Sequence, residues 1–296
     1  MTTANALFPS TGLWTREQVI LALYWYLQIP FGQIHNRNKR LIEWAAIIGR
    51  NVNALSYKMV NLSSLDPVIT RSGRSGLKNR SNLDEAIWNE YKGKFEQLTR
   101  DAESLLALRG KTPSDQLRLQ PDYQDSIESD SENQDSEAVN WPVLLEPTRS
   151  VEFEGESVER VVKQRLKQQF FRSMVISNFD GKCCISGLAL PSLLVASHIV
   201  GWADAPSERL NPHNGLALSA LYDKAFDQHL LTLNESFEIM LSPILLKALS
   251  KTPYDCGLLG VEGRVIATPR RFKMDAELMQ RHRLIFLKKI SDNRLI

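Results

Sequence analysis

The apolar positions near the start of the chain predict a buried helix. Thr15 and Gln18 have the spacing of a capping box, in which each side chain bonds to the backbone N–H of the other residue. The residues that follow Thr15, REQVILALYWYLQI, are apolar on most faces, a pattern typical of a helix with no exposed side. Pro30 and Gly32 then end the predicted helix.

Two further helices follow at the spacing of a helix-turn-helix. One is expected between the N-cap residue Asn38 and the helix-ending Gly49, and the other over residues 52–62. In a helix-turn-helix the second helix enters the major groove of DNA. The side chains available for this contact are Asn51, Asn53, Ser56, Tyr57 and Lys58. A plain helical hairpin within a bundle explains the same pattern equally well.

A basic loop with Gly73 and Gly76 comes next. Its cations are Arg71, Arg74, Lys78 and Arg80. Basic side chains on a Gly/Ser loop can follow a phosphate backbone, so these four residues are candidate DNA contacts, and an ordinary solvated surface is the alternative. Residues 81–110 then predict one closing amphipathic helix that ends at Gly110.

The C-terminal half changes from helix to short strands. A helix is expected over residues 155–179, and the apolar segments LLVASHIV and GLALS then predict two strands separated by a polar loop. The next segment, ALYDKAFD, has helical spacing, and HLLTLNESFEIMLS reads as a β-hairpin. With the helical N-terminal part, this order predicts an α+β protein.

Composition is that of an ordinary soluble globular protein. Of the 296 residues, 43% are hydrophobic and 24% charged, enough for one large core or two modest ones. The longest apolar run is shorter than the roughly 18 residues of a membrane helix, and the N-terminus lacks the pattern of a signal peptide. Three cysteines, of which Cys183 and Cys184 are adjacent, suit a reducing compartment. We therefore expect a cytoplasmic protein with no membrane partner.

The formal net charge of +2 conceals an uneven distribution. Residues 1–111 carry a net charge of +6, residues 112–148 carry −8 and residues 149–296 carry +4. The middle segment is rich in Asp, Glu, Ser, Gln and Pro, which predicts an acidic flexible linker between two domains. A solvated loop of one domain is the alternative. Two basic parts suit two contacts with one polyanion, and the linker would repel DNA or cover a basic face.

Three polar residues of the strand–loop–strand–helix unit are candidates for catalysis. His198 lies in an otherwise apolar strand, Asn214 precedes the second strand, and Asp223 begins a helical turn. Histidine titrates near neutral pH, so it can act as a base towards the water that attacks a phosphodiester. Asp223 and Asp227 share one helix face and could hold Mg²⁺ or Mn²⁺. The alternatives are a core histidine, an ordinary turn and exposed helix carboxylates.

At this point the sequence resembles the HNH (ββα-metal) endonuclease family, and in particular its restriction-type branch. Members of that branch read C-x-I-(S/T)-G, then L-x-x-(A/S)-S-H-I-x-x-W, E-R-L-x-P-x-N-G-L-x-L-S and D-x-x-F-D. This chain has CCISGLALPSLLVASHIVGW, ERLNPHNGLALS and LYDKAFD, within a similarity that covers roughly residues 160–290. The resemblance implies a ββα-metal nuclease domain that hydrolyses double-stranded DNA with a divalent cation.

The resemblance also implies a role for individual residues. His198 corresponds to the general base, Asn214 to the residue that holds the loop and orients that base, and Asp223 to a catalytic metal ligand, with Asp227 one turn later. The chain departs from the family just before the base. An Asp or His ligand is common there, and this chain has Ser197, whose hydroxyl is a weak ligand. Many relatives hold a structural zinc with two CxxC pairs; this chain has none, so no structural zinc is predicted.

Arg209 lies in the loop between the base and Asn214, where it would clamp the scissile phosphate; an ion pair with Glu208 is the alternative. His213 lacks a comparable context, although its position beside Asn214 could bring it near the site. The N-terminal part resembles a domain that precedes restriction-type HNH modules, which implies a DNA reader.

These patterns predict a restriction endonuclease with a helical DNA-recognition domain over residues 1–111, a linker over 112–148 and an HNH domain over 149–296. Modified, methylated DNA is the expected substrate, because some relatives of this architecture act only on such DNA. Restriction of an unmodified site and a catalytically inactive HNH-fold DNA-binding protein are the alternatives. One ββα site usually cuts one strand, so cleavage of both strands would favour a homodimer.

Overall fold

The computed structural model describes residues 7–67, 69, 80–119, 155–201, 203–252 and 257–292. In the N-terminal part the helices are α2 (Arg16–Tyr26), α3 (Lys39–Ile48), α4 (Val52–Ser63), α6 (Asn82–Tyr91), α7 (Phe95–Leu108) and α8 (Pro113–Arg118). In the C-terminal part the elements are α9 (Gly155–Asn178), β1 (Leu194–His198), β2 (Gly215–Ser219), α10 (Ala220–Asp227), β3 (Leu231–Leu233), β4 (Ile239–Leu241), α11 (Pro243–Leu249) and α12 (Ala276–Ser291). Helices with two small sheets confirm the α+β prediction.

The first predicted helix is confirmed as α2. Thr15 and Gln18 form the capping box, and every residue from Gln18 to Tyr26 is buried. The Trp25 ring stacks on Trp44 of α3 with 5.1 Å between ring centroids. A helix without an exposed face is stabilised mainly by packing, and here it forms the centre of the N-terminal bundle.

The helix pair α3–α4 also has the predicted boundaries. Asn38 and Asn51 cap the two helices, and Gly49 ends α3 with a φ of 72°, in the left-handed region that glycine adopts without strain. The two helices pack against each other and α4 packs on α2. This arrangement fits a helix-turn-helix and a helical hairpin alike.

The prediction of one closing helix over residues 81–110 is wrong. The segment forms two helices, α6 and α7, and Gly93 between them has a φ of 73°. A left-handed residue cannot continue a right-handed helix, so the chain turns at this position although the amphipathic pattern continues on both sides. The turn places α6 and α7 side by side against α2.

The first residues of the predicted linker form a helix, which differs from the prediction of a flexible segment from residue 112 onwards. Residues 113–118 form α8, which packs on α7 and α9. Thr112 and Asp115 bond reciprocally at its start, and the buried Gln116 side chain donates to the carbonyls of Glu103 and Lys111. These bonds attach the first residues of the predicted linker to the folded bundle. Residues 120–150, which hold most of its acidic side chains, lie outside the described residues.

The strands β1 and β2 pair antiparallel, with His198 opposite Gly215 and Leu194 opposite Ser219. Both α9 and α10 pack against these two strands. Gly215 permits the close approach of α9, because a Cβ atom there would lie 2.3 Å from Cγ2 of Val175. The predicted hairpin is confirmed as the antiparallel pair β3–β4.

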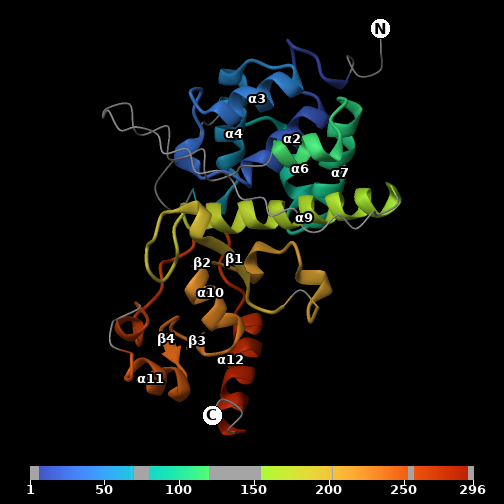
Figure 1. Ribbon diagram of the computed structural model, residues 1–296. Helices are drawn as coiled ribbons and strands as arrows, with labels where there is room; N and C mark the ends of the chain where they lie inside the picture. Colours follow the sequence, from blue (N-terminus) through green and yellow to red (C-terminus); the bar gives the residue numbers. More distant parts are fainter. Residues whose placement is uncertain are drawn as a thin grey trace, which may run out of the picture.

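Helix α9 lies between the N-terminal helices and the unit formed by β1, β2 and α10 (Figure 1). Tyr24 of α2 stacks on Phe170 of α9 at 4.7 Å, and one hydrophobic core runs through both parts. The two predicted domains therefore pack directly on each other. Among the described helices, none combines the length and the apolar character needed to cross a membrane.

Candidate active site

The ββα unit brings the predicted site residues together on three elements. Ser197 and His198 end β1, Asn214 comes directly before β2, and Asp223 and Asp227 lie on α10. Because α10 packs against both strands, residues 25 or more positions apart in the sequence come together at one end of the sheet.

An aromatic ring and a backbone carbonyl both hold His198. Its imidazole stacks on Phe171 of α9 with 3.9 Å between ring centroids, and its Nε2 lies 3.1 Å from the carbonyl oxygen of Arg209. A carbonyl only accepts hydrogen bonds, so Nε2 carries the hydrogen and Nδ1 is the basic nitrogen. Burial lowers the pKa of His198, and the Arg209 carbonyl opposes this shift. The ring is therefore neutral at pH 7, the state that a general base needs.

Asn214 ties together the loop between β1 and β2. Its Nδ2 donates to the carbonyls of Val200, at 3.1 Å, and Glu208, at 3.3 Å, while its Oδ1 accepts from the backbone N–H of Val200 at 2.9 Å. The side chain is fully buried. Arg209, whose carbonyl binds His198, directly follows Glu208, so these bonds hold the partner of His198 in place.

Asp223 and Asp227 form a pair of carboxyl groups on α10. Burial raises the pKa of both groups, and the charge of Asp227 raises that of Asp223 further. Lys224 opposes the shift in both cases. Two carboxyl groups that are less acidic than usual would gain from a cation, because a positive charge between them favours their ionised form.

Ser197 lies beside Asp223, and its hydroxyl lowers the pKa of that carboxyl. Oγ of Ser197 is buried and has no partner at normal hydrogen-bond geometry in the described part of the chain, so its interaction with this carboxyl is a weak one. This buried hydroxyl group therefore retains capacity for a further hydrogen bond or metal contact next to Asp223.

These oxygen donors fit a hard divalent cation. Within the described residues, no three His, Cys, Asp or Glu side chains converge, so the protein would offer two carboxylates and the Ser197 hydroxyl. Mg²⁺ is commonly bound through one or two carboxylates, with water and substrate phosphates completing its shell. Cys183 and Cys184 are both buried, and burial raises the pKa of the Cys184 thiol, which disfavours the thiolate that zinc binds.

The geometry of the ββα unit agrees with the comparison with known families. Residues 183–234 match the family model of the HNH endonucleases. The matched segment of the chain, called the HNH segment below, contains all the candidate residues of the ββα unit. The match supports HNH ancestry and suggests nuclease activity on DNA. It does not extend to the N-terminal helices, and comparison with curated proteins gives no significant match.

The HNH segment also contains Arg209, whose position in the site is set by its backbone. Its carbonyl accepts the bond from His198, and its side chain is half-buried in the loop next to Asn214. The Glu208 carboxylate accepts hydrogen bonds from Ser207 Oγ and Asn211 Nδ2. The phosphate contact of the Arg209 guanidinium remains a prediction.

Lys58 is buried, which argues against its predicted contact with DNA. Its ammonium group lies 2.7 Å from the Asp84 carboxylate, and both side chains are less than 10% exposed. The same ammonium group lies over the ring of Trp14. A lysine that is paired and buried inside the bundle cannot reach a phosphate without breaking that pair. The hydropathy pattern of α4 does not predict the burial of Lys58, because its partner Asp84 is 26 positions away in the sequence.

Other predicted DNA contacts have different positions. Arg80 is exposed and 3.8 Å from Glu85, while Arg71, Arg74 and Lys78 lie outside the described residues. On α4, Tyr57 is 62% exposed and lines a hollow of about 300 Å³ together with Asn53 and Ser56. The hollow therefore lies along an exposed part of α4.

Two further residues lie near the site: Phe171, which carried no recognisable signal in the sequence, and His213, which its position beside Asn214 suggested. Phe171 supplies the ring against which His198 stacks, although it lies in a helix 27 positions upstream. His213 faces the N-terminal helices: it donates from Nδ1 to the carbonyl of Lys273 at 2.5 Å and contacts the Phe272 ring. The packing of α9 brings Phe171 to the site, whereas His213 directly precedes Asn214 in the chain.

Proposed function

We propose that the protein is a metal-dependent DNA endonuclease of the restriction type that acts on modified DNA. The observation that carries this proposal is the state of His198, a neutral imidazole held in one tautomer at the end of β1, within the HNH segment. Asp223 and Asp227 on the adjoining helix supply the oxygen donors that such a reaction requires.

In the proposed reaction, Nδ1 of His198 accepts a proton from the water that attacks the phosphodiester. The Arg209 carbonyl keeps the opposite nitrogen protonated, and Asn214 keeps that carbonyl in place. A divalent cation bound by Asp223, Asp227 and Ser197 would stabilise the charge that develops on the phosphoryl and leaving oxygens. The Arg209 guanidinium would contact the scissile phosphate.

The N-terminal helices are proposed to read the target. Support comes from the exposed Tyr57 and Asn53 on α4, and from the resemblance of this part to domains that precede restriction-type HNH modules. Dependence on methylated DNA rests on that resemblance. Cleavage of both strands would require two copies of the single ββα site, so we propose a homodimer on DNA. A role inside the cytoplasm agrees with the proposed substrate.

The test is cleavage of plasmid DNA by the wild type and by His198→Ala. Plasmids from methylating and non-methylating hosts are incubated with Mg²⁺ or Mn²⁺ and separated by electrophoresis. We expect the wild type to cut methylated plasmid and His198→Ala to lose at least about a hundredfold in rate. Cleavage of both plasmids alike would indicate restriction of an unmodified site. If neither protein cuts either plasmid, the nuclease proposal fails.

A second candidate function is that of an inactive HNH-fold DNA-binding protein. The observation in its favour is Ser197, since its hydroxyl stands where relatives place a stronger metal ligand. Replacing this serine distinguishes the two candidates. If Ser197→Asp cuts DNA while the wild type only retards it in a gel, the native chain is a binding protein.

A further inference from the structure

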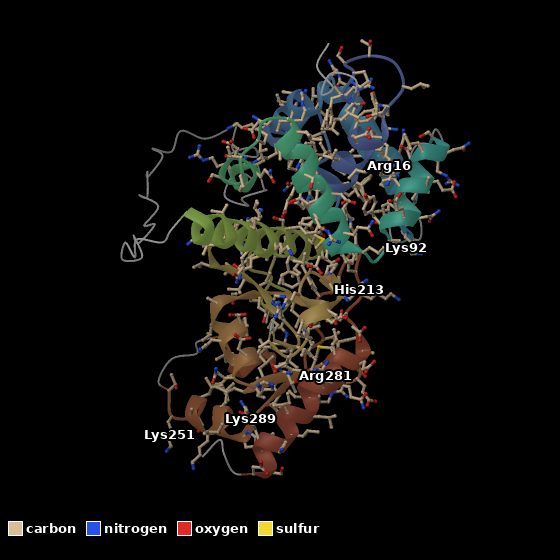
Figure 2. The ribbon with its side chains drawn as sticks, turned by 90° about the vertical axis from the view of Figure 1, so that its right-hand side faces the viewer. Arg16, Lys92, His213, Lys251, Arg281 and Lys289 are labelled. Atoms are coloured by element: carbon tan, nitrogen blue, oxygen red, sulfur yellow. The ribbon has the colours of Figure 1, made fainter. Side chains whose placement is uncertain are left out.

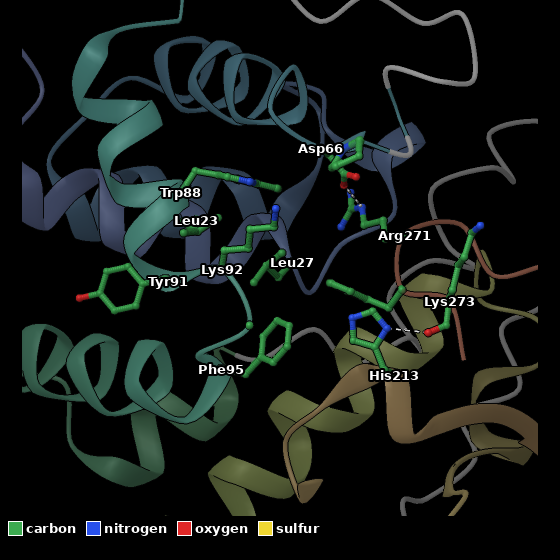
Figure 3. Close-up of a pocket in the computed structure, with 13 residues that line it drawn as sticks. Leu23, Leu27, Asp66, Trp88, Tyr91, Lys92, Phe95, His213, Arg271 and Lys273 are labelled. Carbon is green, nitrogen blue, oxygen red and sulfur yellow. Dashed lines mark hydrogen bonds and ion pairs between the residues drawn. The ribbon is translucent and has the colours of Figure 1, made fainter. Parts of the chain in front are cut away.

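A cavity of about 460 Å³ lies where the N-terminal helices meet the C-terminal part. This junction pocket is lined by α2, by the turn between α6 and α7, and by the segment 271–273, with His213 of the HNH segment at one side (Figure 3). The pocket residues Lys92 and His213 lie near the middle of the molecule, and Lys251 lies towards its lower end (Figure 2). Its volume is within the range of small-ligand sites.

The walls of the junction pocket are mostly aromatic and aliphatic. Leu23 and Leu27 of α2 line one side, and Trp88, Tyr91 and Phe95 come from α6 and the start of α7. Phe272 completes the lining and contacts Phe95 edge to face at 5.6 Å between centroids. Aromatic walls favour a flat, π-bonded ligand, because the two surfaces can stack.

Arg271 lies in the wall of the same space and carries an unmet hydrogen-bond donor behind that wall. Its Nη1 donates to the Tyr26 carbonyl at 2.7 Å, and its Nε lies 3.6 Å from the Asp66 carboxylate. Its Nη2 is buried and has no hydrogen-bond partner in the described part of the chain. A buried guanidinium nitrogen without an acceptor is costly, and the positive charge of this guanidinium in the pocket wall favours a ligand with carbonyl or ring-nitrogen acceptors on that side.

The rim of the junction pocket carries positive charge. Lys92 and Lys273 are both exposed at the edges of the lining, on opposite sides in Figure 3. The one carboxylate of the lining, Asp66, is paired with Arg271 and accepts a hydrogen bond from Tyr26. A ligand with an apolar, acceptor-bearing face and an anionic group at its edge would complement this arrangement.

We propose that the junction pocket binds a single nucleobase, with its ring between the aromatic walls, an acceptor towards the Arg271 side of the pocket and its phosphate at the lysine rim. A nucleobase combines a π-face with carbonyl and ring-nitrogen acceptors, and its nucleotide carries the anionic group. Two sources share this chemistry: a free nucleotide, and a base extruded from duplex DNA. The second source rests on the proposed nuclease function, which brings DNA to the neighbouring HNH segment.

The experiment uses the full-length His198→Ala chain without metal, so that DNA stays intact. In the first arm, calorimetric titration measures the binding of each 2′-deoxynucleoside 5′-monophosphate. In the second arm, fluorescence anisotropy compares a paired duplex with the same duplex carrying a central mismatch, because a mismatched base is extruded at a lower free-energy cost.

Three further substitutions, each made in that background, assign the binding to the pocket. Trp88→Leu removes a stacking surface, Lys273→Met removes a rim cation, and Arg271→Lys keeps a charge near Asp66 but loses the free nitrogen. Lys251→Met is the matched control, an exposed lysine remote from the pocket. Thermal unfolding is measured for each variant, so that a loss of binding in a destabilised protein is recognised.

We expect one monophosphate per chain, or a mismatched duplex bound at least fivefold more tightly than the paired one. Trp88→Leu should weaken that binding about tenfold and Lys251→Met should leave it unchanged. Binding of a monophosphate without a preference for the mismatched duplex identifies a free nucleotide as the ligand. A preference for the mismatched duplex without monophosphate binding identifies an extruded base.

Absence of both signals, or binding that survives Trp88→Leu and Lys273→Met, would overturn the inference. The outcome is independent of catalysis, because wild-type cleavage is measured separately. A chain that cuts DNA but shows no pocket-dependent binding refutes the nucleobase site alone. A chain that binds a nucleobase but cuts no DNA refutes the nuclease proposal alone.

Discussion

His198 takes its chemical state from residues outside its own strand. The Phe171 ring and the surrounding chain bury the imidazole and lower its pKa, and the Arg209 carbonyl selects the tautomer. The sequence pattern identifies a histidine in an apolar strand, and nothing in that strand distinguishes a base from a core residue. The partners that make it basic at Nδ1 lie on α9 and in the following loop.

The pH dependence of cleavage should reflect this burial. Protonated His198 cannot accept a proton, so the rate should fall as pH decreases through a pKa below the ordinary value near 6.5. Phe171→Leu removes the stacked ring, and we expect the acid limb to move to higher pH. Cleavage rates between pH 4.5 and 8, with an NMR titration of the His198 ring, measure the shift. An acid limb that stays in place would exclude Phe171 as a cause of the lowered pKa.

The burial of His282 leads us to expect that the folded protein loses stability in acid. It is buried, its Nε2 lies 3.1 Å from the Phe226 carbonyl and its Nδ1 lies 2.9 Å from Oγ1 of Thr232. Burial, followed by the charge of His229, lowers its pKa to about 4. The unfolded chain binds this proton near pH 6.5, so stability is complete above that pH and is lost as pH falls towards 4.

The loss expected from His282 is about 3 kcal/mol, from a shift of roughly two and a half pKa units. Urea unfolding at pH 7 and pH 4.5 measures it in the wild type and in His282→Gln. The variant should lose less stability between the two pH values, while Asp223 and Asp227 titrate alike in both proteins. Equal losses in both proteins would contradict the assignment.

At the scale of elements, the site depends on how β1, β2, α9 and the connecting loop fit together. Asn214 closes the loop through three hydrogen bonds to Val200 and Glu208. At Gly215, α9 packs so close to β2 that a Cβ atom would overlap Val175. Asn214 and Gly215 are neighbours in the sequence. Asn214 positions the Arg209 carbonyl and Gly215 allows α9 with Phe171 to pack closely, so substitutions at either residue should affect cleavage indirectly, through His198.

Asn214→Asp tests the loop. The carboxylate can still accept from the Val200 N–H but cannot donate to the two carbonyls, so we expect about 1–3 kcal/mol lower stability and a large loss of cleavage. Asn82→Asp is a matched control, because it makes the same change of amide to carboxylate at an exposed residue of α6. Cleavage and thermal unfolding are measured together. Wild-type cleavage by Asn214→Asp would show that the loop bonds do not position His198.

Gly215→Ala tests the contact between β2 and α9. The new methyl group would overlap Val175 and come within 3.0 Å of Phe171, the ring that packs on His198. We expect destabilisation of about 1–3 kcal/mol and reduced cleavage. Val175→Ala should restore part of both losses in the double variant, which a double-mutant cycle of unfolding free energies quantifies. Additive effects would mean that the two side chains do not interfere.

At the scale of the whole molecule, the two predicted domains form one packed structure. Tyr24 and Phe170 stack across the boundary, and Arg271 reaches the Tyr26 carbonyl and Asp66. The +6 and +4 segments are therefore held in a fixed relation by their contacts, and the junction pocket exists only because of them. The acidic segment 120–150 therefore joins, in sequence, two parts of the chain that contact each other directly.

Deletion of residues 120–138 tests the role of the acidic segment. If its charge repels DNA or covers a basic face, the shortened chain should bind DNA more tightly at low salt, with a steeper dependence on salt concentration. Fluorescence anisotropy between 50 and 200 mM salt measures both quantities, and replacing the same residues by a neutral Gly/Ser segment of equal length controls for the change in length. Unchanged affinity and salt dependence would reduce the segment to a spacer.

The sequence by itself determined the local elements and the nuclease motif. Caps at Thr15, Asn38 and Gly49, and the strand–loop–strand–helix order around His198 and Asn214, depend on contacts within a few residues, and such contacts are visible in the spacing of residue types. The motif additionally carried a resemblance that the match over residues 183–234 supports.

Only the tertiary structure decided which of these side chains remain accessible and what surrounds them. The burial of Lys58 against Asp84, the stack of Phe171 on His198 and the unmet donor of Arg271 each join segments that are 26 or more positions apart. Such contacts depend on how helices pack after they form, and hydropathy along the chain contains no record of that packing. The shared core of the two halves, and the pocket between them, arise for the same physical reason.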